Sequence, residues 1–164
     1  MRRIEAGQEV SIASTPSWTA QALDAGECRR LLATAAYGRL VFTRGALPVV
    51  QPMRFRVRDE QVLMATRAGS RLSRAVRGAV VAFEVDHLDT VTGAGWTVTA
   101  VGPAHVLTDP DDIAAAALLG LRTWVPTAAY SYVAVQIGIL RGCCTSLGTD
   151  GAHTFLVEGR LPQS

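Results

Sequence analysis

The sequence predicts a mainly β protein with short helices, whose antiparallel strands close into a barrel or split into two packed sheets. Six or more short segments of strand type, separated by turn residues, follow one another along the 164 residues. The turns are tight, which favours antiparallel neighbours. The apolar fraction is 49% and the charged fraction is 18%, so the chain is globular and can build one core. A sheet of this kind has to hide its edges, which is why we expect closure or a second layer.

The chain opens with a polar segment that is followed by a helix. Residues 1–20 are polar, small and aperiodic, and we expect a flexible arm ahead of a single domain over residues 21–164. A helix is expected over residues 23–38, because Asp24 has the spacing of a helix cap and leucines recur on one face. Gly38 is expected to end this helix.

Strands fill most of the remaining sequence, with two short helices between them. Strands are expected over residues 38–43, 47–57, 62–66, 79–86, 95–107 and 132–140, with a last one over 153–159, and helices over 69–78 and 109–121. Pro48 and Pro52 indicate that the second strand lies at an edge or carries a bulge. Gly102-Pro103 predicts a bend in the longest strand.

Composition argues against several classes of function. A formal net charge of +2 is too small to indicate nucleic-acid binding, and no apolar run approaches the roughly 18 residues of a membrane span. Every basic residue is Arg, which suits phosphate binding but is also explained by a compositional bias of the genome. The three cysteines, Cys28, Cys143 and Cys144, form no readable disulfide framework, which suits a reducing cytosol. We therefore expect a cytoplasmic protein that binds neither nucleic acid nor membrane.

The first candidate site lies where a strand meets a helix. Thr66 ends the strand, Ser70 begins the helix and Arg71 follows it. Unpaired N–H groups at a helix start, two hydroxyls and a guanidinium together suit a phosphate group. An ordinary capped helix with a solvated Arg explains the same residues, and spacing alone leaves both explanations open.

A basic strand face and a tryptophan are the next candidates. Arg54, Arg56 and Arg58 alternate with apolar residues and share one face of their strand, where three like charges call for solvent or for an anion. Trp96 follows the small residues Gly-Ala-Gly, which would leave room for a flat ligand beside the indole. Packing in the core or in an interface is the alternative for this side chain.

Other polar residues indicate chemistry less directly. Cys143 and Cys144 with His153 lack the spaced pairs of a zinc site, so no metal is expected. His105 suits a haem ligand or, more simply, a satisfied histidine of the core, and His87 is a conceivable acid or base. No nucleophile elbow, P-loop or dinucleotide fingerprint is present, and no catalytic residue is assigned.

Five segments, taken in order, resemble one known family. GRLVFT, LPVVQPMRF, VLMAT with GSRL, VAFEVD and GWTVTAVGPA are similar to segments of the pyridoxamine 5'-phosphate oxidase-like family, the FMN-binding split barrel. The likeness is closest to its small actinobacterial and nitroimidazole-resistance-like branch and covers residues 24–107 well. It implies a six-stranded antiparallel split β-barrel of Greek-key type, and a homodimer with FMN in a groove at the interface.

The resemblance also implies which residues bind the cofactor. The similar positions are Gln51, Met53 and Arg54 along the flavin, Thr66, Ser70, Arg71 and Leu72 at the phosphate, and Trp96 and Thr97 at the flavin edge, from the other subunit. Arg54 stands where the branch usually has Asn, and Arg71 where it often has Lys. The segment LRGCCTSLG replaces the Arg/His pattern of the true oxidase, so vitamin B6 synthesis is not expected.

The function that the resemblance implies is an FMN-dependent oxidoreductase that acts on an unknown small molecule. Three alternatives remain open. Within the same fold, a deazaflavin could replace FMN in a reductase. The protein could also be a non-enzymatic flavin or haem binder that senses or stores its ligand, or a barrel that has lost its ligand.

Overall fold

Eight strands and three short helices make up the part of the protein that the computed structural model describes, residues 17–124 and 129–148. The strands are β1 (Ser17–Ala22), β2 (Tyr37–Arg44), β3 (Leu47–Arg58), β4 (Gln61–Arg67), β5 (Val80–Leu88), β6 (Gly95–Val106), β7 (Tyr130–Gln136) and β8 (Ile139–Gly148). The helices are α1 (Ala25–Thr34), α2 (Arg71–Ala75) and α3 (Pro110–Leu118). None of these described helices has the length and apolar character needed to cross a membrane.

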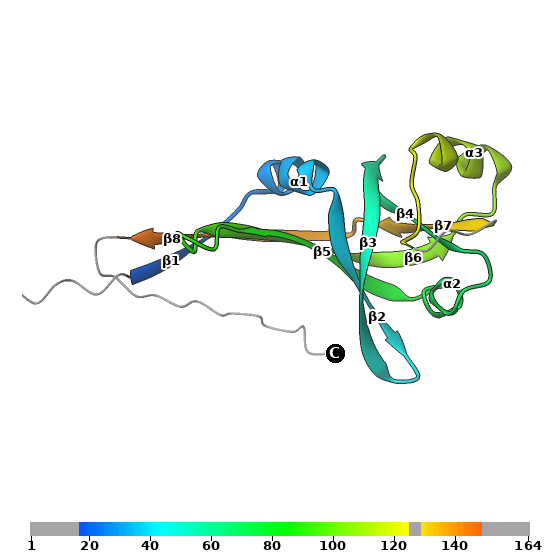
Figure 1. Cartoon of the computed structure of the whole chain (residues 1–164), viewed down its shortest axis with the longest axis horizontal. Helices are drawn as coiled ribbons and strands as arrows, with labels where there is room; N and C mark the ends of the chain where they lie inside the picture. The colour runs from blue at the N-terminus through cyan, green and yellow to red at the C-terminus, as the bar shows by residue number, and fades with distance from the viewer. Residues whose placement is uncertain (1–16, 125–128, 149–164) are drawn as a thin grey trace, which may run out of the picture.

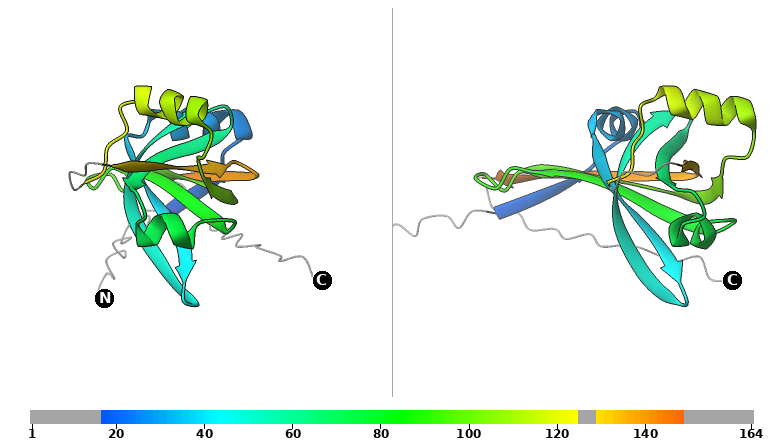
Figure 2. Two further views of the ribbon diagram at one scale, coloured as in Figure 1. Left: turned by 90° about the vertical axis from the view of Figure 1, so that its right-hand side faces the viewer. Right: turned by 45° about the vertical axis from the view of Figure 1, so that its right-hand side comes forward.

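Six strands close into an antiparallel barrel (Figure 1, Figure 2). Their order is β6-β5-β2-β3-β4-β7, and β7 pairs with β6 to complete the circle. β8 pairs with the first part of β6, and β1 adds to β8, so these strands reach away from the barrel together with the end of the β5–β6 hairpin. The predicted six-stranded antiparallel barrel is confirmed, and β8 and β1 are additions to it.

The long strand β6 changes its neighbour at Gly102 and Pro103. Residues up to Val101 pair with β8, whereas those from Ala104 pair with β7. A side chain at Gly102 would place its Cβ 1.8 Å from the Gln136 carbonyl oxygen, so only glycine fits at the junction where β7 ends beside β6. The residues at which we predicted a bend therefore mark the point where the barrel closes.

Alternation along β3 places one of its faces in the core, as predicted. Met53 and Phe55 are 4% and 1% exposed, and the Phe55 ring meets the Phe83 ring edge-on, with centroids 4.7 Å apart. Arg54, Arg56 and Arg58, which alternate with the apolar residues, are exposed. Pro48 and Pro52 lie in the first half of β3, which pairs with β2 but not with β4, so the predicted edge position is confirmed.

Helix α1 is shorter than predicted. Asp24 caps it as expected, and its carboxylate accepts a 2.8 Å hydrogen bond from the Glu27 N–H. The helix ends at Thr34 rather than at Gly38. Gly38 lies in β2 instead, where a Cβ would come within 2.4 Å of the Phe83 ring. Packing across the β2–β5 pair, and not the end of a helix, is what requires this glycine.

The start of the described chain also differs from the prediction. Residues 17–20, which we expected in the arm, belong to β1 and pair with β8. Backbone hydrogen bonds to a distant strand order this segment, which has no apolar periodicity of its own. Residues 1–16 and the strand predicted over 153–159 lie outside the described residues.

The strand predicted over residues 132–140 is two strands. Ile137 and Gly138 leave the ladder, because the Ile137 N–H donates to the Glu60 carbonyl and the Gly138 N–H donates to the Val101 carbonyl. β8 then continues through residues 141–148, for which no strand was predicted. β7 and β8 follow each other along the same side of β6, the side opposite β5.

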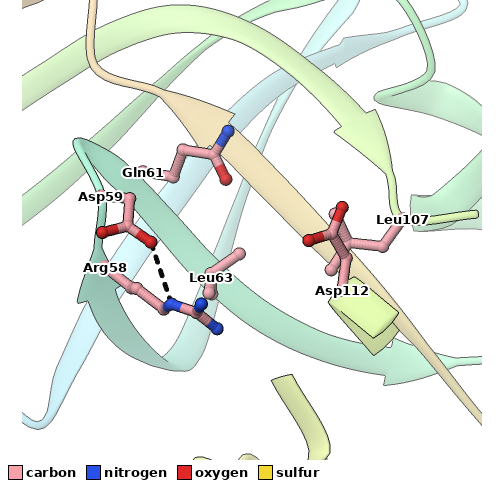
Figure 3. A pocket seen from close by; sticks show the side chains of 6 residues that line it. All are labelled: Arg58, Asp59, Gln61, Leu63, Leu107 and Asp112. Carbon is pink, nitrogen blue, oxygen red and sulfur yellow. Dashed lines mark hydrogen bonds and ion pairs between the residues drawn. The ribbon is translucent and has the colours of Figure 1, made fainter. Parts of the chain in front are cut away.

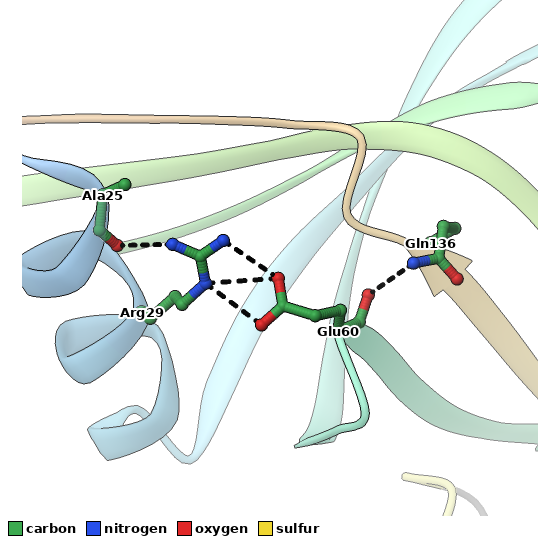
Figure 4. A network of polar contacts seen from close by, with 4 residues as sticks. All are labelled: Ala25, Arg29, Glu60 and Gln136. Atoms are coloured by element: carbon green, nitrogen blue, oxygen red, sulfur yellow. Dashed lines mark hydrogen bonds and ion pairs between the residues drawn. The ribbon is translucent and has the colours of Figure 1, made fainter.

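The turn between β3 and β4 is held from two sides (Figure 4). Asp59 and Glu60 have φ angles of 50° and 58°, in the left-handed region that favours glycine. The Arg29 guanidinium of α1 donates to the Glu60 carboxylate at 3.0 to 3.2 Å, and the Gln136 side chain donates to the Glu60 carbonyl at 3.2 Å. These contacts tie α1 and β7 to the turn.

Candidate functional site

Thr66 and Ser70 come together where β4 ends. Their hydroxyl oxygens are 3.0 Å apart, and Thr66 is 6% exposed. Ser70 caps α2 by accepting a 3.1 Å hydrogen bond from the Ser73 N–H. Arg71 follows Ser70 and is exposed. The two hydroxyls therefore lie together where β4 ends, and Arg71 is the next residue along the chain.

Helix α2 is shorter than predicted, so its dipole contributes little to this site. It spans Arg71–Ala75 rather than residues 69–78, because Gly69 has a φ of 65° and Val76 already ends the helix. A single turn carries little of a helix dipole, so an anion here would be held by side chains. Leu72 is 5% exposed and belongs to the core, so any contact of this residue with a cofactor would come from its backbone.

Arg54 lies in a hollow with an aromatic wall. Its Nε and Nη2 donate to the Tyr37 hydroxyl at 2.9 and 2.6 Å, and the Tyr37 ring stacks on Trp124 with centroids 5.2 Å apart. The Trp124 indole N–H donates to the Pro52 carbonyl at 3.0 Å. The hollow has a volume of about 140 Å³ and is lined by Ala36, Tyr37, Arg54, Arg56, Gly120 and Leu121. Tyr37 and Trp124 are not among the site residues that the sequence predicts.

A second hollow adjoins the first at Tyr37. It has a volume of about 330 Å³ and is lined by Tyr37, Gly38, Arg39, Pro52 and Asp86. Arg39 forms ion pairs with Glu84 at 3.7 Å and with Asp86. The hydrogen bond to Asp86 raises the pKa of Arg39, which keeps the guanidinium charged.

A third hollow adjoins the second at Asp86. It has a volume of about 190 Å³ and is lined by Asp86, His87, Leu88, Trp96, Thr97, Cys143 and Thr145. Trp96 stacks on His87 with ring centroids 6.3 Å apart. The indole is half-buried and also packs against the core, so both explanations that the sequence left open apply to it. Through the shared Tyr37 and Asp86, the three hollows form one run across the surface.

The glycines before Trp96 serve the backbone and not a ligand. A Cβ at Gly95 would lie 2.3 Å from the His87 carbonyl oxygen, so the space that we assigned to a flat ring is filled by β5. Gly93 has a φ of 69° and closes the hairpin turn, where its N–H donates to the Asp89 carbonyl at 2.6 Å.

The predicted cofactor residues are distributed over two regions. Arg54, Trp96 and Thr97 line the three adjoining hollows, whereas Gln51 and Met53 do not. Gln51 is half-buried in β3, and Met53 is 4% exposed with its side chain in the core. A contact of Met53 with a cofactor would therefore involve the backbone of β3.

The histidines and cysteines form no metal cluster in the part of the chain that the structure describes. His105 is exposed on β6, so the expectation of a core histidine is wrong: in the alternation of β6, Ala104 points inward and His105 outward. All three cysteines are free, and burial raises the pKa of the Cys28 thiol. His153 lies outside the described residues.

A smaller pocket lies between β4 and α3 (Figure 3). It is lined by Arg58, Asp59, Gln61, Leu63, Leu107 and Asp112, and its volume is about 50 Å³. Arg58 donates to Asp59 at 2.9 Å, so its charge is already paired. Such a volume suits a few ordered water molecules rather than a cofactor.

Comparison with known proteins places this chain in one family. The family model of pyridoxamine 5'-phosphate oxidase matches residues 24–142. The uncharacterized protein Rv0080 of Mycobacterium tuberculosis is 41% identical over 125 residues, which cover 73% of this chain and 82% of the relative.

Two solved structures share the fold closely. The FAD binding protein of Mycobacterium smegmatis is 32% identical with a TM-score of 0.64, and the match covers 74% of this chain and 97% of that chain. A Corynebacterium glutamicum protein provisionally assigned as a pyridoxamine 5'-phosphate oxidase is 26% identical with a TM-score of 0.67, over 79% of this chain and 95% of that chain. Because the family model spans most of the described barrel and the relatives align over most of their length, this chain belongs to the pyridoxamine 5'-phosphate oxidase family.

Proposed function

We propose that this protein binds a flavin nucleotide and acts as a flavin-dependent oxidoreductase on a small molecule. The observation that carries the proposal is the run of three adjoining hollows, which combines aromatic rings with guanidinium donors. Flat aromatic ligands with polar edges suit such a surface. The 32% identical neighbour from Mycobacterium smegmatis is a FAD binding protein, which supports the same class of ligand.

The residues of the hollows fit the ring of a flavin. Arg54 uses Nε and Nη2 for Tyr37, so Nη1 remains available to donate to a polar ring edge. A positive charge there would stabilise negative charge on a reduced ring. Trp96 offers half-buried ring surface for stacking, with Thr97 beside it. A bound flavin supplies the electron-transfer chemistry, and the chain supplies binding, orientation and electrostatics.

The residues at the end of β4 fit the phosphate of the same ligand. Thr66 and Ser70 already orient each other's hydroxyls, and Arg71 adds a charged, two-pronged donor. No carboxylate of the described residues pairs with Arg71, so its guanidinium has no competing internal anion.

FMN is the flavin that we propose, and FAD is the second candidate because the Mycobacterium smegmatis neighbour binds FAD. Both carry the same ring and a phosphate. Mass spectrometry of the ligand released from purified protein tests the proposal. FMN or FAD supports flavin binding, whereas a deazaflavin would support the alternative reductase. A haem, or a protein that takes up no flavin after reconstitution, would contradict the proposal.

The phosphate contact predicts a specific mutant effect. Arg71→Ala should weaken FMN binding by roughly tenfold to a hundredfold, the scale of one charged hydrogen bond. Riboflavin lacks the phosphate and should bind both proteins equally, as measured by quenching of flavin fluorescence. Arg141→Ala, at an exposed arginine of β8, is the matched control. Equal affinity of wild type and Arg71→Ala for FMN would show that the phosphate lies elsewhere.

We further propose that the protein is a homodimer and that each partner covers the hollows of the other. The hollows are open, and large apolar side chains stand exposed at their rims, Tyr37 at 42%, Leu88 at 59% and Trp124 at 63%. Patches of this kind on a protein surface are typical of contacts with a partner.

A cytoplasmic location also belongs to the proposal. Cys28, Cys143 and Cys144 are all free thiols, which suits a reducing compartment.

A further inference from the structure

Arg56 brings hydrogen-bond donors to the first hollow that the proposed flavin contacts do not use. Its side chain lines this hollow together with Tyr37 and Arg54. The Nη1 group of Arg56 donates to the Phe55 carbonyl at 3.0 Å, and its Nε and Nη2 groups have no partner among the described residues. These two groups form the side of a guanidinium that can donate two parallel hydrogen bonds to one carboxylate.

The Tyr37 hydroxyl adds a further donor to the same hollow. Its oxygen accepts hydrogen bonds from Nε and Nη2 of Arg54 at 2.9 and 2.6 Å, so its own hydrogen is left for another acceptor. Among the described residues, no hydrogen bond donated by this hydroxyl is found. The ring is held by stacking on Trp124, whose indole N–H donates to the Pro52 carbonyl at 3.0 Å. The donor therefore has a defined position in the wall of the hollow.

No carboxylate in the part of the chain that the structure describes neutralises Arg54 or Arg56. The ion pairs there are formed by four other arginines, Arg29, Arg30, Arg39 and Arg58. Asp86, in the adjoining second hollow, pairs with Arg39. The remaining walls of the first hollow, Ala36, Gly120 and Leu121, offer no side-chain acceptor. The hollow thus combines charged donors with an apolar wall, which suits an anion that has an apolar body.

We propose that the first hollow is the substrate subsite and that it binds a small organic carboxylate. Nε and Nη2 of Arg56 would hold the carboxylate by two parallel hydrogen bonds, and the Tyr37 hydroxyl would donate to one of its oxygens. The volume of about 140 Å³ suits a body as large as one benzene ring, because an apolar cavity of about 150 Å³ binds benzene. This inference rests on the proposed flavin binding, in which the ring lies in the adjoining hollows beside the substrate.

Calorimetric titration of the flavin-loaded protein with two matched pairs of ligands tests the subsite. Benzoate or butyrate should bind at least about tenfold more tightly than its uncharged amide, benzamide or butyramide, which is the lower end of the effect of one charged hydrogen bond. Arg56→Gln should remove roughly this advantage. Arg56→Lys should keep part of it, because the charge stays while the two-pronged geometry is lost. Tyr37→Phe should weaken carboxylate binding several-fold, because the ring stays and only the hydroxyl donor is removed.

Arg58→Gln is the matched control for Arg56→Gln. Arg58 lies on the same face of β3, but its guanidinium donates to Asp59 and it does not line the first hollow. This variant should bind the carboxylates as tightly as wild type. Arg56 is exposed, so neither of its substitutions should lower the melting temperature.

The flavin affinity of the same proteins separates this inference from the proposed function. If flavin binds but neither carboxylate is preferred over its amide, or if Arg56→Gln keeps the preference, the subsite is wrong while flavin binding stands. If Arg56→Gln loses affinity for flavin as well, Arg56 contacts the flavin and the subsite is also wrong. If wild type takes up no flavin and still binds a carboxylate through Arg56, the flavin proposal is wrong and the carboxylate site stands.

Discussion

Trp96 lies at the boundary between the core and the third hollow. Its half-buried indole packs against core side chains, stacks on His87 and lines the hollow with Thr97. A substitution of Trp96 should therefore change both the stability of the protein and its affinity for flavin. If the tryptophan had only a structural role, only stability would change, and if it only bound the ligand, only affinity would change.

Trp96→Leu should therefore show two moderate effects. Loss of a stacked aromatic costs about 0.5–1.5 kcal/mol beyond area burial, so flavin affinity should fall several-fold. The partial cavity should lower the free energy of unfolding of the cofactor-free protein by about 1–2 kcal/mol, less than for a fully buried aromatic. Flavin fluorescence should rise, because the indole no longer quenches it.

Val91→Ala provides a control on the same hairpin, because Val91 is 92% exposed and should affect neither quantity. Unchanged affinity and quenching in Trp96→Leu, together with a loss of stability, would leave the indole with a structural role alone.

The sequence identified some site residues and missed others for a physical reason. Arg54 was visible because strict alternation along β3 puts every arginine on one face. Its partner Tyr37 was not, because the pairing of Tyr37 with Arg54 depends on the register of β2 against β3. Trp124 is farther still along the chain, and only the folded molecule stacks it on Tyr37.

Among the elements, the junction where β7 ends beside β6 has the shortest contact of any described glycine. Gly102→Ala would bring a Cβ into the Gln136 carbonyl oxygen, and backbone atoms cannot move aside as a flexible side chain can. Overpacking a core usually lowers the free energy of unfolding by about 1–3 kcal/mol. We expect the loss in Gly102→Ala to reach or exceed the upper end of this range. Urea denaturation measures it as a lower midpoint.

Gly138→Ala is the control for this junction, because a Cβ there would lie at an ordinary 3.4 Å from the Val101 carbonyl oxygen. Its stability should stay within about 1 kcal/mol of wild type. If both substitutions lower the free energy of unfolding equally, the short contact at Gly102 is not the cause of the loss in Gly102→Ala.

The β5–β6 hairpin should loosen in acid. The Asp89 carboxylate accepts hydrogen bonds from the N–H groups of Val91 at 2.8 Å and Thr92 at 3.2 Å, and these bonds lower the pKa of Asp89. Because the pKa of Asp89 is lower in the folded protein, its ionised carboxylate stabilises the turn fully at pH values above the ordinary Asp pKa of about 3.9. This stabilisation is lost as the pH falls through the lowered pKa of the folded protein. Hydrogen-exchange protection of the hairpin should therefore drop below about pH 4.

Asp89→Asn removes the titrating group and should remove the acid-dependent part of this loss. The same pH profile of hairpin protection in both proteins would contradict a role for the carboxylate.

At this scale the sequence predicted which elements exist better than where they end. The caps Asp24, Ser70 and Asp109 all hold their helices as expected, because capping is a local interaction. The break at Ile137 and Gly138 was invisible, because it depends on carbonyls of the β3–β4 turn and of β6. Pairing between distant strands likewise ordered β1, which a local pattern cannot show.

At the scale of the whole molecule, the barrel presents its three hollows on an open surface. A two-fold interface repeats the same patch on both subunits, so a partner that covers one set of hollows presents its own in return. Two equivalent flavin sites per dimer would follow. Leu88 lines the third hollow and is 59% exposed, which makes it a test position for such a contact.

Leu88→Glu should therefore weaken both association and flavin binding, because a charge at a covered apolar rim loses its hydration. Sedimentation velocity measures the mass, and the ratio of flavin to protein absorbance measures occupancy; wild type should be a dimer with two flavins. Val91→Glu makes the same chemical change at a side chain that is 92% exposed and lines none of the three hollows, so it should remain a loaded dimer. A stable wild-type monomer with a full complement of flavin would show that one chain completes the site alone.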